Sequence, residues 1–374
     1  MEKKDKTLNV PHLRFPEFSG EWEKQSLGAT CNVLMCKRIL ASQTNTAGGV
    51  PFYKIGTIGS IADAYISREL FETYRAKYNY PRKGEVMITC AGTVGKTMLF
   101  DGHDSYYQDS NIVWIDNPNN HIDNTFLYHF LSRVDWSRLN TTTIVRIYND
   151  DLRQLRISYP SKEEQKKISD LLNLLDQRIE TQKKIIEKYE SLIRGLYHSV
   201  FNQPASVLQL KDVLSVVKGK QVNGDALLEE GKFYVMNGVT EPSGYLDEYN
   251  TPANTISISE GGNSCGYVQY NTEPFWSGGH CYSLIHKEKD INYQYLYHFL
   301  KYKERDIMAL RIGSGLPNVQ KKDLERFEIR VLPTEQQNRV TEILQEVSAK
   351  CDLEKRILQG WQCQKVFLLR NLFI

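Results

Sequence analysis

The sequence predicts an α+β fold: two similar β-rich units joined by two long antiparallel coiled-coil helices, with a pseudo-two-fold internal repeat. Three observations predict this fold. A segment from the middle of the chain reappears near its C-terminal end, 172 residues further on, as in Ile168 and Val340. Both copies carry a heptad pattern of apolar residues. The stretches before the copies also resemble each other, so the chain alternates unit, helix, unit, helix, at 1–158, 159–201, 202–332 and 333–374.

The composition sets broad limits on the class of protein. A chain of 374 residues exceeds the usual size of one domain, so two or three are expected. Seven scattered cysteines fit a reduced, cytoplasmic protein. The chain has no apolar run of about 18 residues, so we expect no membrane span, and from its charged start we expect no secretory signal. The net charge of +2 says little about partners, because a nucleic-acid binder needs its basic residues gathered on one face.

The first unit, 1–158, is predicted to be β-rich, because short alternating segments are broken by Gly, Asn and Pro. The stretch from Cys90 to Lys96 resembles a phosphate-binding loop at first sight. That loop needs a glycine six residues before its lysine, where this chain has Cys90. A strand–turn–strand hairpin is therefore the favoured interpretation. A short apolar helix is expected at residues 126–131.

The first long helix, 159–201, is predicted from steps of four and three that alternate between apolar residues. Ser161 follows Pro160 and can cap it, and glutamates in the first turn suit the helix dipole. The seam has one polar member, Gln182. Its expected helix-pairing residues are Ile168, Leu172, Leu175, Ile179, Ile186 and Tyr189.

The second unit, 202–332, repeats the first faintly and is expected to share its architecture. The apolar helix recurs at residues 295–300. The turn at residues 261–266 has glycines but no lysine, which argues against a nucleotide site in one repeat only.

The second long helix, 333–374, begins at Pro333, and Thr334 can cap it. Its polar seam residue, Glu354, matches Gln182, and the two are expected to set the register. Neither helix can bury its seam alone, so we expect antiparallel pairing within the chain; a dimerisation arm between two molecules is the alternative. Its expected helix-pairing residues are Val340, Leu344, Val347, Leu358, Trp361 and Leu368.

No arrangement of residues predicts an active site. Cys31 and Cys36 lack the second pair that a zinc site needs, so no metal is expected. Glu230 and Lys232 have the local spacing of a metal-dependent nuclease, but no partner aspartate is evident. His129 and His298 lie in apolar helices and are interpreted as core or interface residues. We therefore predict no catalytic residues and no cofactor bound by this chain.

Two basic clusters are visible in the sequence. From the clusters alone, solvated surface charge is the favoured interpretation. Their members are Arg68, Arg75, Lys77, Arg82 and Lys83 in the first unit, and Lys301, Lys303, Arg305, Arg311, Lys321 and Lys322 in the second.

The order of several motifs resembles the specificity subunit of a type I restriction-modification enzyme. They are the opening residues 11–18 with Trp22, the turn at 92–96, the stretch 314–324 and the Pro-x-x-Glu-Glu-Gln type of entrance to each long helix. The resemblance covers nearly the whole chain. It implies two target recognition domains, each reading one half of a split double-stranded DNA sequence, held apart by the helix pair.

The same resemblance implies the partners. Two modification subunits would dock on the helices and recruit restriction subunits, and these partners would use S-adenosylmethionine, ATP and magnesium. This chain would direct methylation and cleavage without catalysing either. Residues 142–146 of the first unit differ from residues 314–318 of the second, so the two half-sites are expected to differ and the target to be asymmetric.

Candidate DNA contacts are chosen by residue type and repeat position. Base edges are read by amide, hydroxyl and basic side chains, and phosphates by Lys and Arg. In the first unit they are Lys37, Arg38, Lys96, Gln108, Ser110, Asn111 and Arg146. In the second they are Lys218, Lys220, Asn263, Ser264, His280, Arg311, Ser314, Asn318 and Lys321.

Two other hypotheses stay open on the sequence alone. A self-contained nuclease or nucleotide-dependent enzyme would hydrolyse its substrate with a divalent metal and would depend on Lys96 or Glu230. A structural coiled-coil adaptor with two protein-binding heads would lack salt-dependent affinity for DNA.

Overall fold

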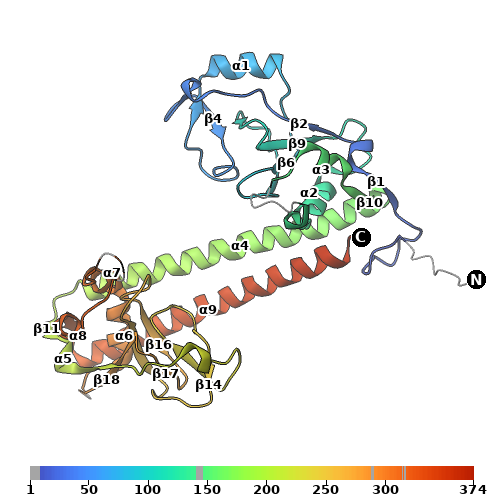
Figure 1. Ribbon diagram of the computed structural model, residues 1–374. Helices are drawn as coiled ribbons and strands as arrows, with labels where there is room; N and C mark the ends of the chain where they lie inside the picture. The colour runs from blue at the N-terminus through green and yellow to red at the C-terminus, as the bar shows by residue number, and fades with distance from the viewer. Residues whose placement is uncertain (1–8, 140–145, 288–289, 314, 316) are drawn as a thin grey trace, which may run out of the picture. The chain divides into compact units, whose positions relative to one another are not determined.

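The computed structural model describes residues 9–139, 146–287, 290–313, 315 and 317–374 (Figure 1). The chain forms two compact units. Unit 1 comprises Met1–Thr181 and Leu358–Ile374, and unit 2 comprises Gln182–Ile357. Each unit therefore contains one globular part and a portion of each long helix, so the boundary between the units lies within both helices.

Unit 1 is built on a four-stranded antiparallel sheet with the order β2-β9-β6-β7. A second sheet has the order β3-β5-β4-β8, and β1 pairs with β10. The strands are β1 (Glu23–Ser26), β2 (Asn32–Leu34), β3 (Thr44–Asn45), β4 (Val50–Tyr53), β5 (Tyr65–Ile66), β6 (Val86–Thr89), β7 (Thr97–Leu99), β8 (Tyr106–Tyr107), β9 (Ile112–Asp116) and β10 (Arg156–Tyr159). The helices of its globular part are η1 (Leu27–Ala29), η2 (Ala41–Gln43), α1 (Arg68–Lys77), α2 (Asn124–Ser132), η3 (Trp136–Leu139) and α3 (Asn149–Gln154).

Unit 2 has the same plan. Its main sheet has the order β12-β18-β15-β16, a smaller sheet has the order β14-β13-β17, and β11 pairs with β19. The strands are β11 (Ser206–Gln209), β12 (Leu214–Lys218), β13 (Phe233–Met236), β14 (Tyr245–Leu246), β15 (Thr255–Ser259), β16 (Val268–Asn271), β17 (Trp276–Ser277), β18 (Cys281–His286) and β19 (Glu328–Val331). The helices of its globular part are α5 (Leu210–Val213), η4 (Gly224–Ala226), α6 (Tyr293–Tyr302), α7 (Glu304–Ala309) and α8 (Lys321–Glu325).

The strand pairings confirm the internal repeat. The two main sheets connect their strands in the same antiparallel order. Each unit also contains one parallel pair, β4 with β8 in unit 1 and β13 with β17 in unit 2. The predicted apolar helices are α2 and α6, and both are buried along one side. The mixed, β-rich fold predicted from the sequence is therefore confirmed for both units.

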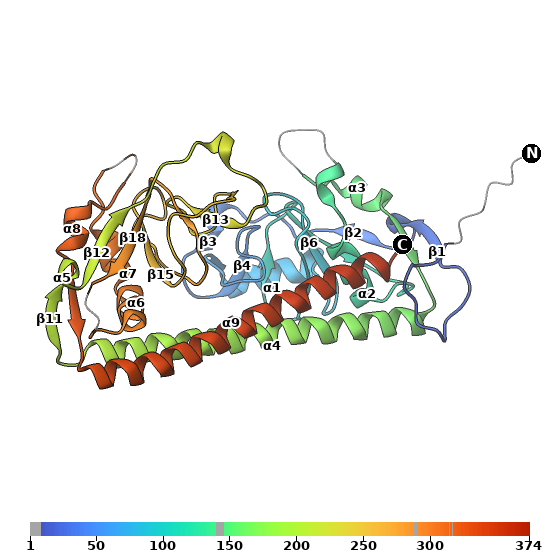
Figure 2. The same cartoon turned by 90° about the horizontal axis from the view of Figure 1, so that it is seen from below.

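The two long helices are α4 (Lys162–Phe201) and α9 (Thr334–Asn371), with 40 and 38 residues. Within each unit, a portion of α4 packs beside an oppositely directed portion of α9 (Figures 1 and 2). In unit 1 Asp176 of α4 forms an ion pair with Lys365 of α9. In unit 2 Gln182 donates from Nε2 to the Glu354 carbonyl oxygen at 3.1 Å and also to its carboxylate. The seam residues predicted from the sequence are all buried or half-buried. Antiparallel pairing within the chain is confirmed, and the two polar seam residues contact each other as expected.

The starts of the long helices differ from the prediction in one respect. Ser161 caps α4, because its hydroxyl accepts a hydrogen bond from the Glu164 backbone N–H at 3.4 Å. The prediction that Thr334 caps α9 is wrong. Thr334 is already the first helical residue, and its hydroxyl donates to the Asp290 carbonyl oxygen at 3.2 Å.

A buried glutamine at each helix start was not predicted. Gln165 and Gln337 are both 1% exposed. The Oε1 atom of Gln165 accepts from the backbone N–H of Asp123, the N-cap residue of α2, at 2.6 Å. Gln337 accepts in the same way from Asn292, the N-cap residue of α6, at 2.8 Å. Each glutamine therefore fastens an apolar helix to the start of a long helix.

The N-terminal segment secures the helix pair in unit 1. The Leu13 backbone N–H donates to the Asn371 carbonyl oxygen at 2.9 Å, at the end of α9. Arg14 donates to both carboxylate oxygens of Glu164 in the first turn of α4, at 2.8 and 2.7 Å. Glu164 is 1% exposed, so Arg14 compensates the negative charge of a buried carboxylate. The opening motif thus binds one helix at its beginning and the other at its end.

Two buried histidines make stability depend on pH. His129 is fully buried and its Nε2 lies 3.1 Å from Asn173 Oδ1, while His298 is 3% exposed and its Nδ1 lies 3.0 Å from the Tyr197 hydroxyl. Burial lowers the pKa of each imidazole to about 4. Because the unfolded chain takes up these protons near pH 6.5, stability is full above that pH and falls as the pH approaches 4.

We expect each histidine to remove about 2 kcal/mol from the free energy of unfolding between pH 7.5 and pH 5. Urea unfolding of the wild type and of His129→Gln at several pH values measures this. The variant should be less stable at pH 7.5 but should lose less stability on acidification. Equal losses in the two proteins would contradict a neutral buried His129.

Candidate nucleic-acid interface

The turn that follows β6 in unit 1 and the turn that follows β15 in unit 2 are held by equivalent backbone hydrogen bonds. In unit 1 Cys90 donates from N to the Asn111 carbonyl oxygen at 2.7 Å, and Ile147 donates to the Cys90 carbonyl oxygen at 2.9 Å. In unit 2 Glu260 donates to the His280 carbonyl oxygen, and Val319 donates to that of Glu260, both at 2.8 Å. Glu260 therefore occupies the place of Cys90.

We call this set of backbone hydrogen bonds around Cys90 and Glu260 the strand–turn frame. It also aligns the candidate contacts of the two units. His280 corresponds to Asn111, and Asn318, one residue before Val319, corresponds to Arg146, one residue before Ile147. The turn in unit 1 joins β6 to β7 as an antiparallel hairpin, so the interpretation of residues 90–96 as a hairpin is confirmed.

A cavity of about 540 Å³ opens beside this frame in unit 2. Four predicted contacts line it: Asn263, Ser264, His280 and Asn318. Asn237 also lines it, and three glycines leave room in its wall: Gly238, Gly261 and Gly262. At Gly238, whose φ is +78°, a Cβ atom would lie 3.0 Å from the His280 Cβ atom. The cavity thus presents amide, hydroxyl and imidazole groups, the types that hydrogen-bond to base edges.

A buried carboxylate, that of Glu260, directly precedes the lining residue Gly261. Glu260 is 8% exposed, and its Oε1 atom accepts from Lys218 Nζ at 2.8 Å and from the Tyr282 hydroxyl at 2.9 Å. Burial, followed by the hydrogen bond to Glu260, raises the pKa of Tyr282, so this phenol stays a neutral donor. Lys218 is therefore fixed by an internal partner, although its side chain is still half exposed.

The remaining predicted contacts of unit 2 lie outside this cavity. Lys220 and Lys218 line a smaller cavity of about 140 Å³. Arg311 is exposed, and Lys321, at the start of α8, lies 3.7 Å from Glu325. Ser314 lies outside the described residues.

Five of the seven predicted contacts of unit 1 lie in two groups. Arg146 donates to the Ser110 carbonyl oxygen at 3.3 Å, and Asn111 follows directly. Ser110 has a positive φ of 50°, which marks a tight turn at this point. Arg38 and Gln108 line a separate cavity of about 230 Å³.

Two predicted lysines of unit 1 have partners inside the protein. Lys96 donates from Nζ to the Ile58 carbonyl oxygen at 2.5 Å. Lys37 lies over the Tyr78 ring, with its Nζ atom 5.4 Å from the ring centroid. Both side chains belong to exposed residues, so each could meet a phosphate only by exchanging this partner.

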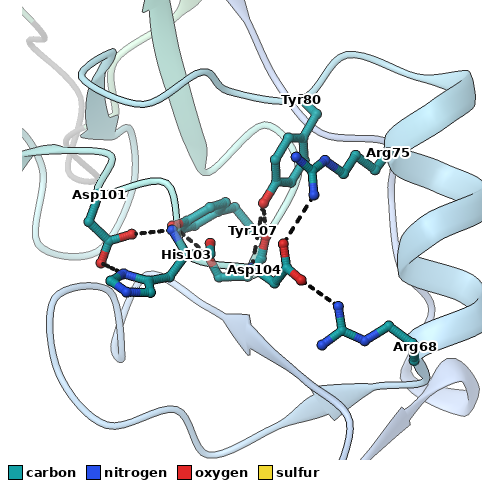
Figure 3. Close-up of polar contacts among 8 residues, drawn as sticks. Arg68, Arg75, Tyr80, Asp101, His103, Asp104 and Tyr107 are labelled. Atoms are coloured by element: carbon teal, nitrogen blue, oxygen red, sulfur yellow. Dashed lines mark hydrogen bonds and ion pairs between the residues drawn. The ribbon is translucent and has the colours of Figure 1, made fainter.

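The first basic cluster consists largely of internally paired residues (Figure 3). Asp104 binds Arg68 on one oxygen and Arg75 at 3.0 Å on the other. The Arg75 guanidinium lies 5.1 Å from the Tyr80 ring centroid. Arg82 is held by Glu85 at 2.8 Å and by Asp116. These arginines have carboxylate partners, which supports the interpretation of surface charge.

Other sequence features are dispersed. Cys31 and Cys36 are buried in different hydrophobic clusters. Glu230 and Lys232 are both exposed. Among the described residues, no group of three or more His, Cys, Asp or Glu side chains could hold a metal ion. No helix of the described chain is long and apolar enough to cross a membrane.

Two polar residues of this region were missed in the sequence. Asn237 accepts from the His280 backbone N–H at 3.0 Å and so shapes the cavity. Glu260 was overlooked because its partners are distant along the chain. The sequence did contain an indication of its role, because a glutamate replaces the buried Cys90 of the first repeat at this position.

Comparisons with known proteins agree on one family. A family model described as the type I restriction modification DNA specificity domain matches residues 19–191 and 202–360. A protein of Haemophilus influenzae named as a type I restriction enzyme specificity subunit is 51% identical over 147 residues, 39% of this chain and 38% of that one. A protein of Mycoplasma genitalium named as a type I specificity subunit is 27% identical over 249 residues, 62% of this chain and 65% of that one. The matches thus span less than two thirds of these relatives.

Solved structures match over a greater length. The crystal structure of a type I restriction-modification S subunit from M. genitalium has a TM-score of 0.72 and 22% identity, and the match covers 98% of this chain and 99% of that one. A structure from a study of assembly and conformational transition in a type I system has a TM-score of 0.52 and 17% identity, over 93% and 96%. At these identities the likeness establishes the fold.

Proposed function

The chain belongs to the family of type I restriction-modification DNA specificity proteins, and from this premise we propose that it reads an asymmetric, two-part DNA target on behalf of partner subunits. The single observation that carries the proposal is the repeated strand–turn frame, with different side chains in each unit. Because both units have the same strand–turn frame, we infer that both present side chains to base edges. Different residues in the two frames predict different half-sites.

The contrast between the frames is chemical. Unit 1 presents Asn111 and Arg146 where unit 2 presents His280 and Asn318. Arginine pairs best with guanine, and asparagine with adenine. We therefore propose an asymmetric target, with each unit responsible for one half-site.

The proposal assigns catalysis to partners. Modification subunits would transfer the methyl group with S-adenosylmethionine, and restriction subunits would use ATP and magnesium. The long helices offer a surface for such partners, because large apolar side chains away from the seam are exposed. On α4 these are Leu174 and Leu192, and on α9 they are Ile343, Leu353, Ile357, Val366 and Phe367. Exposed apolar groups of this size along a helix favour protein contacts.

Salt dependence of DNA binding tests the proposal. We expect the complex of this chain with its modification subunit to bind duplex DNA with a log affinity that falls linearly with log salt, by about 0.9 per phosphate neutralised. Arg311→Gln should make the slope shallower by about one unit, because a phosphate contact is lost. Lys350→Gln is the matched control, since Lys350 is exposed on α9 and pairs with Glu346 at 2.8 Å.

The other hypotheses predict different results. An adaptor would add no salt-dependent affinity to that of the modification subunit alone. A nuclease would degrade the duplex when the chain is supplied with a divalent metal and no partner. An unchanged slope in Arg311→Gln would remove that residue from the DNA-binding set.

A further inference from the structure

Glu260, which precedes the cavity residue Gly261, has only one of its two carboxylate oxygens hydrogen-bonded within the described residues. Oε1 of Glu260 is occupied by Lys218 and Tyr282. Oε2 is buried and has no hydrogen-bond partner among the described residues. A buried carboxylate oxygen without a donor is costly, so it favours any donor that is brought near it.

The neighbour of that oxygen is His280. The Nδ1 atom of His280 lies 3.8 Å from Glu260 Oε2. The backbone of His280 is fixed on both sides, because its N–H donates to Asn237 Oδ1 at 3.0 Å and its carbonyl oxygen accepts from Glu260 N at 2.8 Å. The side chain is 61% exposed. With Nδ1 towards the carboxylate, the Nε2 edge of the ring is the one offered to a ligand.

We propose that His280 is a DNA contact of unit 2, that Glu260 is its positioning residue, and that DNA binding at this unit is coupled to protonation of His280. This inference rests on the proposed function. In the protonated ring Nδ1–H faces Glu260, and Nε2–H donates to an acceptor on the DNA. That acceptor is the O6/N7 edge of guanine or a phosphate oxygen.

The charges around the ring determine the direction of the coupling. Glu260 faces Nδ1, Lys218 already compensates Glu260, and Tyr282 is a neutral donor to the same carboxylate. Protonation of His280 therefore adds a positive charge next to an incoming polyanion. DNA is a polyanion, so the protonated ring binds it more tightly than the neutral ring, and DNA affinity should rise as the pH falls.

Unit 1 lacks this arrangement. Asn111 stands in the place of His280, and Cys90 in the place of Glu260. Burial raises the pKa of the Cys90 thiol to about 12, so it carries no charge at these pH values. The pH effect should consequently depend on the half-site read by unit 2 and not on the other.

The experiment measures the affinity of the complex with its modification subunit for a cognate duplex at pH 6, 7 and 8 and constant ionic strength. Two further duplexes carry one scrambled half-site each. For the wild type we expect about tenfold tighter binding at pH 6 than at pH 8, within the limit of about hundredfold that one linked proton permits over two pH units. His280→Gln should bind more weakly than the wild type and show a flat profile, so its loss of affinity should be larger at pH 6 than at pH 8. Glu260→Gln should retain binding with a smaller pH response.

A matched control histidine lies in unit 1. His103 pairs with Asp101, with 3.0 Å between Nδ1 and Oδ2, and is 87% exposed (Figure 3). His103→Gln removes a histidine–carboxylate pair of similar chemistry outside the cavity. It should keep the wild-type pH profile.

The outcomes separate the inference from the function on which it rests. Absence of sequence-specific binding by the wild type would overturn the proposed function itself. Specific binding with an unaltered pH profile in His280→Gln would overturn only this inference. An equal loss of DNA affinity at every pH in His280→Gln and Glu260→Gln would also overturn it, because a purely structural role of the two residues predicts that result. Replacing single guanines with 7-deazaguanine, or single phosphates with methylphosphonates, then identifies which acceptor His280 contacts.

Discussion

Leu172→Asp is expected to unfold unit 1 and abolish assembly of the complex. Leu172 lies on α4, is fully buried, and belongs to the core cluster that also contains Leu368 and Leu369 of α9. The substitution removes a buried leucine and places a carboxylate in an apolar core. The two effects together cost more than about 5 kcal/mol, which matches or exceeds the total stability of many domains. Ile186→Asp should do the same in unit 2, where Ile186 is 8% exposed.

The measurement is urea unfolding followed by copurification with the modification subunit. Leu174→Asp is the matched control for unfolding, because Leu174 lies two residues away on α4 but is 60% exposed. It should change the free energy of unfolding by less than about 0.5 kcal/mol. A Leu172→Asp protein with wild-type stability would contradict the pairing of α4 with α9.

Removal of one heptad from each long helix is expected to shorten the gap between the DNA half-sites by about three base pairs. Seven residues of helix rise by about 10 Å, and duplex DNA rises by about 3.4 Å per base pair. Deleting residues 183–189 from α4 and 347–353 from α9 keeps both heptad patterns in register. It also keeps Gln182 and Glu354, which contact each other in unit 2.

Mapping the methylated motif of the shortened protein measures the gap directly. The bases of the two half-sites should stay unchanged, because no residue of either strand–turn frame is removed. A deletion from α4 alone is the control, and it should destroy the complex because the seams no longer match. An unchanged gap in an assembled double-deletion complex would show that the length of the helices does not set the spacing.

The long helices could be predicted from the sequence because their information is periodic and local. Alternating steps of four and three located the seam, and the polar pair Gln182 and Glu354 was found by the repeat alone. The helix ends were harder to predict, because they depend on distant partners. Thr334 has the residue type of a cap, yet its hydroxyl donates to the Asp290 carbonyl oxygen, and Gln337 at the same helix start binds the N-cap residue of α6.

The candidate site could be predicted only in part. Residue type and repeat position selected Asn263, Ser264, His280 and Asn318, which the fold gathers around one cavity. Glu260 could not be found in this way, since its contacts with Lys218 and Tyr282 join strands 42 and 22 residues apart in sequence. Lys96 matched a phosphate contact by type, but its ammonium group binds the Ile58 carbonyl oxygen. Such pairings depend on strand register, which composition and spacing do not reveal.

The central claim is that this chain selects a two-part DNA sequence. Long-read mapping of modified bases tests it most directly, in a host without other modification systems that expresses the modification subunit with or without this chain. The account predicts a new methylated motif with two different half-sites and an unspecified gap, present only when this chain is present. An assembled complex that carries methyl donor and produces no such motif would contradict it.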